Sequence, residues 1–536
     1  MAMTSEQAVC GERAGQPARS WRRSARSVLL GALALQYALF QLLTGVQYWD
    51  GPRNLHWGLV AVEAPRFLLD AEDPYDRVNG FRPEPASLAP AGQATGASVP
   101  LHPWWGPLYL LLFGAAWRLT GSYTLLQLVV PLAAGATVLL TYSFGARAFG
   151  RDAALLAAVL LALFPVFREH APLSFVEPLS ALLLLGALWA FLARRTWLAA
   201  GLGALAMYGK IDLIFLYFGT AGLTWLLSRR AEWRLPARHA MLSMAVPALC
   251  LLPWVTLVYL VIGRPTTVGG GARPDVFLTV APQMLEQLYT LPLPLAAAVT
   301  AALCAAAGVG LRDPAARPAA SLLGVWLALG AAVLLVYAAM PGASNNPRVF
   351  IPALPALCLL AGAGLARCGR RVRTYAVAGL LSLFVLVNGA GMLYQSLQAR
   401  EPAAAMPAWE VLRTEPRGVV LTELYWHAAL FARQPATWVE HDPAFQRNIM
   451  HDAANFRRYL ATAPIRYVVL PRDQDAHARR MDLPAARLYQ SLPFGRDLGW
   501  TAEPIASPEV RAYLDTSFPR RAAGEYVIYF VGARGG

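Results

Sequence analysis

The sequence Tyr48-Trp49-Asp50 ends the first long apolar segment of the chain, and Leu101-His102-Pro103-Trp104-Trp105-Gly106-Pro107-Leu108 closes the polar stretch that follows. Between them lies Asp70-Ala71-Glu72-Asp73-Pro74-Tyr75-Asp76, which is rich in acidic side chains. The remaining sequence up to about residue 395 is mostly apolar, so 48–108 is its longest polar interruption. A carboxylate at the boundary between water and lipid is costly unless it is solvated, paired or used. The stretch therefore predicts a membrane protein whose chemistry lies at one membrane face.

The composition excludes an ordinary soluble protein. Of 536 residues, 57% are hydrophobic and only 15% are charged, whereas soluble domains carry about 25% charged residues. The net charge of +14 comes mostly from short arginine clusters between apolar runs, a pattern typical of cytoplasmic loops rather than of nucleic-acid binding. The five cysteines show no paired spacing, so neither a disulfide framework nor a zinc site is predicted.

Apolar runs predict a polytopic α-helical membrane domain, since roughly 20 helical residues cross a hydrocarbon core of ~30 Å. Eleven such runs cover 28–47, 122–146, 153–169, 177–193, 196–209, 212–228, 239–262, 286–311, 319–340, 348–366 and 374–394. If the basic N-terminus, 1–27, is cytoplasmic and the apolar run 104–119 lies in the outer interface, the main arginine clusters all face the cytoplasm. The run 104–119 is therefore expected to form an interfacial helix within a large first outer loop, 48–121.

The composition changes after the transmembrane domain, which is expected to span 28–395. Residues 400–536 are more polar and alternate between short strand-like and helix-like runs. Strands are predicted at 418–422, 465–470 and 525–531, and helices at 452–462 and 473–481. The odd number of crossings places this small α/β domain outside the cytoplasm.

Two acidic residues stand at the outer ends of predicted membrane helices. Asp50 follows the first helix, where partial desolvation would raise the pKa of its carboxyl and make it a better general base. A helix-end acid that bonds a neighbouring amide is the structural alternative. Glu177 opens a membrane helix and is followed by Pro178, an arrangement that the helix dipole alone would favour. Glu177 also follows Glu169 and His170 on the same loop, so a divalent cation such as Mg²⁺ or Mn²⁺ is an open alternative, although no ligand spacing specifies one.

Basic residues at the same predicted face are candidates for binding a phosphate. Lys210 lies with Asp212 at the tip of an outer hairpin, where it either meets a phosphate as a point charge or pairs locally with Asp212. Arg348 follows Asn345-Asn346-Pro347 at the start of another helix and either binds a phosphate or extends to the interface.

Four segments together resemble the membrane glycosyltransferases of the GT-C fold, which include protein O-mannosyltransferases and lipid A aminoarabinose transferases. They are Trp49-Asp50; Asp73-Pro74-Tyr75-Asp76 with His102-Pro103-Trp104-Trp105-Gly106-Pro107-Leu108; Phe149-Gly150-Arg151-Asp152 leading to Glu177-Pro178; and residues 201–210, ending in Tyr208-Gly209-Lys210. The resemblance covers roughly 28–366. The family often has a second acid where this chain has Gly51, and a second proline where it has Trp104.

The resemblance implies roles for individual residues. Asp50 would take a proton from an acceptor hydroxyl, and Glu177 would shape the acceptor or metal site. Lys210 and Arg348 would hold the phosphate of a polyprenyl-phosphate-linked sugar donor. Asp73, Tyr75, His102 and Asp212 complete the predicted substrate-binding residues.

The predicted function is that of an inverting glycosyltransferase, specifically a hexosyltransferase, in the inner (plasma) membrane. It would move a sugar from its lipid donor to a hydroxyl of an acceptor glycan, lipid or protein on the outer face. A transporter or flippase of lipid-linked sugars is the alternative, but such folds often show repeats and midplane charges. An assembly protein whose outer domain only binds partners is a third class.

Overall fold

A computed structural model describes residues 16–48, 50–63, 107–210, 213–262, 274–339, 347–437, 449–475, 479 and 505–534. Four of the predicted site residues, Asp73, Tyr75, His102 and Asp212, lie outside the described residues. The helices before the C-terminal domain are α2 (Gln16–Thr44), α3 (Asp50–Glu63), α5 (Pro107–Thr120), α6 (Tyr123–Gln127), α7 (Val129–Ala148), α8 (Arg151–Leu163), α9 (Pro165–His170), α10 (Val176–Leu192), α11 (Thr196–Gly209), α12 (Leu213–Arg229), α13 (Ala237–Ile262), α14 (Pro274–Tyr289), α15 (Leu293–Leu311), α16 (Arg317–Ala338), η1 (Pro347–Ala353), α17 (Leu354–Arg367) and α18 (Arg370–Thr414).

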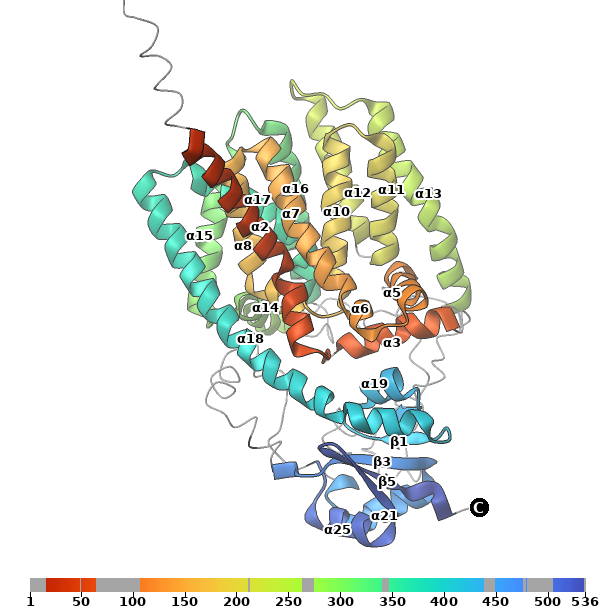
Figure 1. Cartoon of the computed structure of the whole chain (residues 1–536). Helices are drawn as coiled ribbons and strands as arrows, with labels where there is room; N and C mark the ends of the chain where they lie inside the picture. Colours follow the sequence, from red (N-terminus) through yellow and green to blue (C-terminus); the bar gives the residue numbers. More distant parts are fainter. Residues whose placement is uncertain are drawn as a thin grey trace, which may run out of the picture.

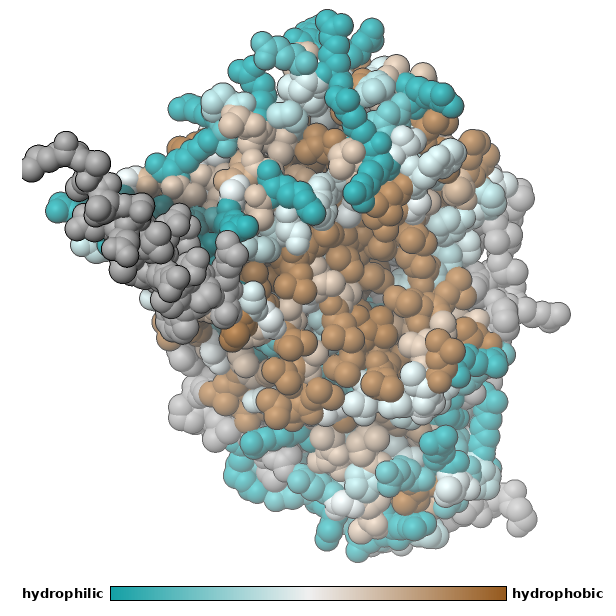
Figure 2. Space-filling view, turned by 45° about the horizontal axis from the view of Figure 1, so that its top comes forward, coloured by the Kyte–Doolittle hydropathy of each residue, from teal (hydrophilic) through white to brown (hydrophobic). Residues whose placement is uncertain are grey.

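The helical bundle has the surface of a membrane protein. Figure 2 shows apolar side chains gathered over the middle of one face, with polar side chains towards both ends. Within the described ranges, seven helical segments are long and apolar enough to cross a membrane, and α10 and α12 are shorter apolar helices. Each of the eleven predicted runs overlaps helix, but the run 286–311 includes the break at 290–292 between α14 and α15. The polytopic α-helical class is therefore confirmed, while the count of eleven crossings stays a prediction.

Small residues let the central helices approach closely. The segment Pro347–Arg367, which contains α17, is the most buried of the membrane-length helices, and it packs between α8 and α15. A Cβ added at Gly364 would lie 1.8 Å from the carbonyl oxygen of Ala306, and one at Gly310 would lie 2.2 Å from that of Leu360. Only glycine therefore allows this backbone contact between α15 and α17. Such close packing is expected in a membrane, because the hydrophobic effect does not drive helices together in lipid.

The loop predicted as the first outer loop contributes two helices, which pack between the bundle and the C-terminal domain (Figure 1). The helix predicted at 104–119 is present as α5, whose interfacial position stays a prediction. Helix α3, which the sequence analysis did not predict, packs along α5. A Cβ on Gly58 would lie 2.4 Å from the Cβ of Phe113, so the two helices touch at a glycine. The chain thus turns back at Asp50 and runs along the end of the bundle.

The C-terminal domain is a small mixed sheet with helices, as predicted. Its strands are β1 (Val419–Leu421), β2 (Ala436–Thr437), β3 (Ile465–Pro471), β4 (Arg520–Ala523) and β5 (Tyr526–Phe530), in the order β2-β1-β3-β5-β4. β1 pairs in parallel with β2 and β3, whereas β5 pairs antiparallel with β3 and β4. The helical elements are α19 (Tyr425–His427), η2 (Ala428–Ala432), α21 (Ala453–Thr462), α25 (Pro508–Ser517) and η4 (Val531–Arg534). The three predicted strands correspond to β1, β3 and β5, and the helix predicted at 452–462 is α21; the one at 473–481 lies mostly outside the described residues.

Helix α18 joins the two parts without a break, because it continues from Arg370 through the expected boundary at 395–400 to Thr414. In Figure 1 it descends along the bundle and ends beneath α3, beside the sheet. The start of α2 and the C-terminal domain lie at opposite ends of the bundle (Figure 1). The end of the bundle that carries α3, α5 and the starts of α10 and η1 therefore faces the C-terminal domain.

Candidate functional site

Three predicted site residues from separate elements form one ion cluster, called here the Glu177 cluster. Glu177 lies in the first turn of α10, Lys210 directly follows α11, and Arg348 lies in η1. One carboxylate oxygen, Glu177 Oε1, is 3.5 Å from Lys210 Nζ and 3.4 Å from Arg348 Nε. The side chains of Glu177, Lys210 and Arg348 are 4%, 6% and 20% exposed. Two cations thus meet at one carboxylate oxygen, and guanidinium and ammonium groups are those that bind anionic ligands such as phosphate.

Aromatic side chains complete the wall of the Glu177 cluster. The guanidinium carbon of Arg348 lies 4.9 Å from the ring centroid of Phe175, a cation–π contact. The His170 ring meets Phe175 edge-on, with centroids 5.0 Å apart, and its Nδ1 lies 2.8 Å from the carbonyl oxygen of Val166. Because a carbonyl only accepts, this His170 nitrogen carries the hydrogen. Phe175 therefore fixes the Arg348 fork from one side.

Buried oxygens near Glu177 are suited to a ligand that carries hydroxyl groups. In the described part of the chain, Glu177 Oε2 and the hydroxyl oxygens of Ser174 and Ser180 are buried without a hydrogen-bond partner. Ser180 lies one helical turn after Glu177, on the same side of α10. Buried acceptors of this kind gain free energy when a donor reaches them. A sugar hydroxyl has the required donor and acceptor chemistry.

The start of α3, where Asp50 lies, adjoins the segment that leads to Glu177. Ser174 donates its backbone N–H to Gln47 Oε1 at 3.0 Å and accepts a hydrogen bond from Asn54 Nδ2 at 2.7 Å. Gln47 comes three residues before Asp50 and Asn54 four after it, while Ser174 comes three before Glu177. The backbone segment that begins α3 at Asp50 therefore packs against the segment that leads to Glu177.

Gln47 is the residue through which these segments meet, and sequence reasoning missed it. Its backbone N–H donates to Gln127 Oε1 at 3.0 Å, and its Nε2 donates to the carbonyls of Gln127 and Pro172. His427 from the C-terminal domain donates from Nε2 to the Gln47 carbonyl at 2.8 Å. A Cβ at residue 51 would lie 2.5 Å from Gln47 Oε1, so Gly51 gives this amide its room. The available signal was a glutamine at the end of an apolar run and another, Gln127, within one.

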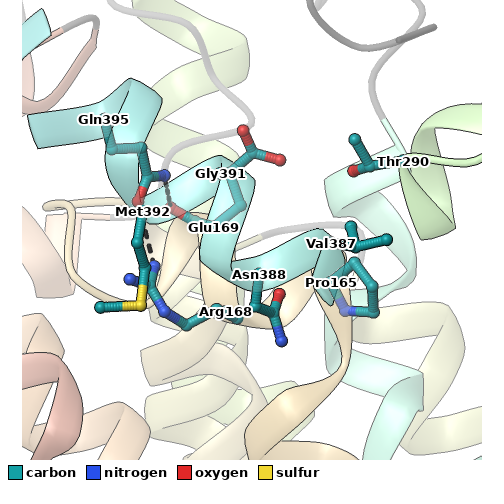
Figure 3. Close-up of a pocket in the computed structure, with 9 residues that line it drawn as sticks. All are labelled: Pro165, Arg168, Glu169, Thr290, Val387, Asn388, Gly391, Met392 and Gln395. Carbon is teal, nitrogen blue, oxygen red and sulfur yellow. Dashed lines mark hydrogen bonds between the residues drawn. The ribbon is translucent and has the colours of Figure 1, made fainter. Parts of the chain in front are cut away.

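A shallow recess lies between α9 and α18, and Arg168, Asn388 and Gln395 are among the residues that line it (Figure 3). Arg168 donates to Gln395 Oε1 at 3.0 Å, and Gln395 donates to the backbone carbonyl of Glu169 at 3.1 Å. Asn388, also on α18, caps the carbonyl of Leu163 at 2.7 Å, where α8 ends. These contacts fix α18 against α9, whose last residue, His170, leads into the Ser174 segment.

The sequence left open a divalent cation near Glu169, His170 and Glu177. Among the described residues, no group of three or more His, Cys, Asp or Glu side chains is placed to hold a metal ion. Glu169 and His170 are both buried on α9, and His170 uses its Nδ1 in the bond to Val166. A divalent cation therefore stays a proposal.

The fold is the GT-C fold of polyprenyl-phosphate-dependent membrane glycosyltransferases, and the chain is a multi-pass membrane protein. Its solved structural neighbours include ArnT from Cupriavidus metallidurans bound to undecaprenyl phosphate, with a TM-score of 0.55, 15% identity, and coverage of 95% of this chain and 98% of that one. ArnT in the apo state gives a TM-score of 0.56 at 14% identity, with the same coverage. No protein-family model matches the sequence, and no curated protein is similar to it at the sequence level.

Proposed function

We propose that the protein is an inverting glycosyltransferase that moves a sugar from a polyprenyl-phosphate donor to an acceptor hydroxyl on the outer face of the membrane. The observation that carries this proposal is the Glu177 cluster, in which Lys210 and Arg348 meet at one carboxylate at one end of an apolar GT-C bundle. A lipid phosphate lying at the end of the bundle would meet two cations with an apolar wall beside them. The undecaprenyl phosphate bound to the neighbouring ArnT structure is a ligand of this class.

The donor phosphate would bind to Arg348 and Lys210. The Arg348 guanidinium, whose Nε faces Glu177, is a planar fork of the kind that binds two phosphate oxygens. Lys210 adds a point charge, and Glu177 holds both cations in place. The polyprenyl chain would lie along the apolar helices. Asp73, Tyr75, His102 and Asp212, together with Glu177 Oε2 and Ser180, would contribute polar contacts to the sugar or acceptor.

The reaction would be a single displacement. The Asp50 carboxylate takes the proton of the acceptor hydroxyl, whose oxygen forms a bond to the anomeric carbon. The bond from that carbon to the phosphate oxygen breaks, and the lipid phosphate leaves with the electron pair. Positive charge from Arg348 and Lys210 stabilises the developing negative charge on the leaving group. Attack opposite the leaving group inverts the anomeric centre.

The experiment is a transfer assay with the protein reconstituted in liposomes, using radiolabelled undecaprenyl-phosphate hexoses and cell-envelope acceptor fractions. We expect transfer with the wild type, and a loss of at least about 100-fold for Asp50→Asn, in line with removal of a general base. Asp152→Asn is the matched control, because Asp152 is exposed and pairs with Arg26 at the opposite end of the bundle. Equal transfer by Asp50→Asn and wild type would refute the catalytic assignment. Lipid movement between leaflets without transfer would favour the flippase alternative.

The divalent cation is tested in the same assay. If Mg²⁺ or Mn²⁺ bridges the donor phosphate and an acidic loop, chelation abolishes transfer and either ion restores it. Unchanged transfer in excess chelator would show that the reaction needs no divalent cation.

A further inference from the structure

The C-terminal domain contacts the candidate site through one hydrogen bond. The proposed reaction assigns no step to this domain. His427 lies in α19 and is 5% exposed. Its Nε2 donates to the main-chain carbonyl of Gln47 at 2.8 Å, across 380 residues of sequence. Gln47 is the residue whose side chain also bonds the Ser174 segment. A single residue of the outer domain thus reaches the point where the Asp50 and Glu177 segments meet.

Apolar and aromatic contacts hold His427 in this position. Trp426 packs edge-on against Trp57 of α3, with ring centroids 5.7 Å apart. Tyr123 of α6 donates from its hydroxyl to the carbonyl of Leu430 at 3.0 Å. Arg433 pairs with Glu63 at the far end of α3. The segment 425–433 therefore covers α3 along its length, and His427 lies where α3 begins.

A second connection reaches the Glu177 segment from the other side. Helix α18 leads into the C-terminal domain and is fixed to α9 through Gln395, which bonds both Arg168 and the carbonyl of Glu169 (Figure 3). Four residues after His170, the chain reaches Ser174. The two segments that carry the proposed base and the ion cluster are thus each fastened to the C-terminal domain.

We infer that the C-terminal domain is a positioning element of the active site, and that His427 is the residue through which it fixes Asp50 relative to the Glu177 cluster. His427 acts through the Gln47 carbonyl and touches no substrate. The His427 imidazole donates a hydrogen bond to the main-chain carbonyl of Gln47. The Gln47 side-chain amide in turn accepts a hydrogen bond from the Ser174 N–H. These two bonds together set the position of the proposed base, Asp50, relative to the proposed phosphate site. This inference rests on the proposed function, because it concerns the same site.

The chemistry of amide side chains provides a matched pair of variants. In His427→Gln, the amide nitrogen takes the place of imidazole Nε2 and keeps the donor to Gln47. In His427→Asn, the amide nitrogen takes the place of Nδ1 and does not reach the carbonyl. Both variants remove the imidazole and introduce the same functional group, so they differ mainly in reach.

The test combines steady-state transfer kinetics with hydrogen–deuterium exchange of the full-length protein in nanodiscs. We expect kcat to fall about tenfold to a hundredfold in His427→Asn with donor KM within about twofold, since misplacement by ~1 Å has effects of this size. His427→Gln should recover kcat to within about threefold of wild type. Exchange should rise in His427→Asn at residues 45–54 and 171–177, and not in the sheet of the C-terminal domain.

Three results would overturn the inference. They are an unchanged kcat in His427→Asn, an equal loss in both variants, and an exchange increase confined to the C-terminal domain. The exchange measurement needs no turnover, so it separates this inference from the proposed function. If the wild type transfers no sugar but exchange rises at 45–54 and 171–177 only in His427→Asn, the positioning contact stands and the proposed reaction fails.

Discussion

Acidification is expected to weaken the docking of the C-terminal domain through His427. Burial lowers the pKa of the His427 imidazole from its ordinary value of 6.5 to about 4, against the raising effect of the hydrogen bond to the Gln47 carbonyl. The folded protein therefore prefers the neutral ring, while the unfolded chain takes up a proton near pH 6.5. The contribution of His427 to the free energy of unfolding therefore keeps its full value above pH 6.5 and decreases as the pH falls from 6.5 towards 4.

The size of the effect follows from the two pKa values. Each unit of difference corresponds to about 1.4 kcal/mol, so the full loss is about 3 kcal/mol below pH 4. Between pH 7.5 and pH 5.0, integration of the proton uptake gives about 2 kcal/mol, a factor of roughly 30 in the docking equilibrium. Because other groups titrate in this range, only the difference between two proteins isolates His427.

The assay compares wild type with His427→Gln by hydrogen exchange at residues 45–54 and by thermal unfolding in detergent, at pH 7.5 and pH 5.0. Glutamine keeps the donor to Gln47 and does not titrate, so the variant should lose about 2 kcal/mol less than wild type on acidification. Parallel pH profiles for the two proteins would refute the reasoning, because they would show that the imidazole is not held neutral by burial.

Three further perturbations test the ion cluster and the helix packing. Glu177→Gln removes the carboxylate that Lys210 and Arg348 share and should lower stability by about 3 kcal/mol. Adding Lys210→Met to Glu177→Gln should recover part of this loss in thermal unfolding, and additive losses would contradict the coupling. Arg348→Lys should weaken binding of undecaprenyl phosphate about tenfold in a lipid-binding assay, since a point charge replaces a planar fork, and unchanged affinity would argue against a bidentate contact. Gly364→Leu should destabilise the bundle by about 3 kcal/mol through overpacking. Gly308→Leu is the control, because a Cβ added there meets nothing within 4 Å, and it should change stability by less than about 0.5 kcal/mol. Similar melting temperatures for the two variants would refute the α15–α17 contact.

The parts of the fold that depend on local pattern could be predicted from the sequence. Apolar runs located the membrane helices, and buried β-rich runs located β1, β3 and β5. Helix α3 was missed because it is short and contains glycine and proline near its start, so its stability comes from packing rather than from propensity. β2 has two residues and β4 is an exposed edge strand, so only their pairing partners define them.

For the candidate site, the sequence indicates individual residues but not the contacts between them. Glu177, Lys210 and Arg348 could be selected as candidates from the sequence because a charge at the start or end of an apolar helix needs a partner. That they pair with one another depends on the packing of α10, α11 and η1, which no local pattern specifies. The junction at Gln47 was beyond reach, because its contacts join residues 80, 127 and 380 positions apart. Neutral amides and a lone histidine carry no signal that identifies their partners.

The C-terminal domain shares a hydrophobic core with the helices that follow Asp50. One hydrophobic cluster contains Leu55 of α3, Tyr109 of α5, Trp409 of α18 and Ile528 of β5. A domain that shares its core with α3 and α5 cannot separate without exposing those helices, and a 14-residue helix such as α3 is marginal alone. Loss of the C-terminal domain should therefore disorder the segment that begins at Asp50. We therefore expect the placement of the proposed base to depend on the folding of a domain that begins more than 300 residues later.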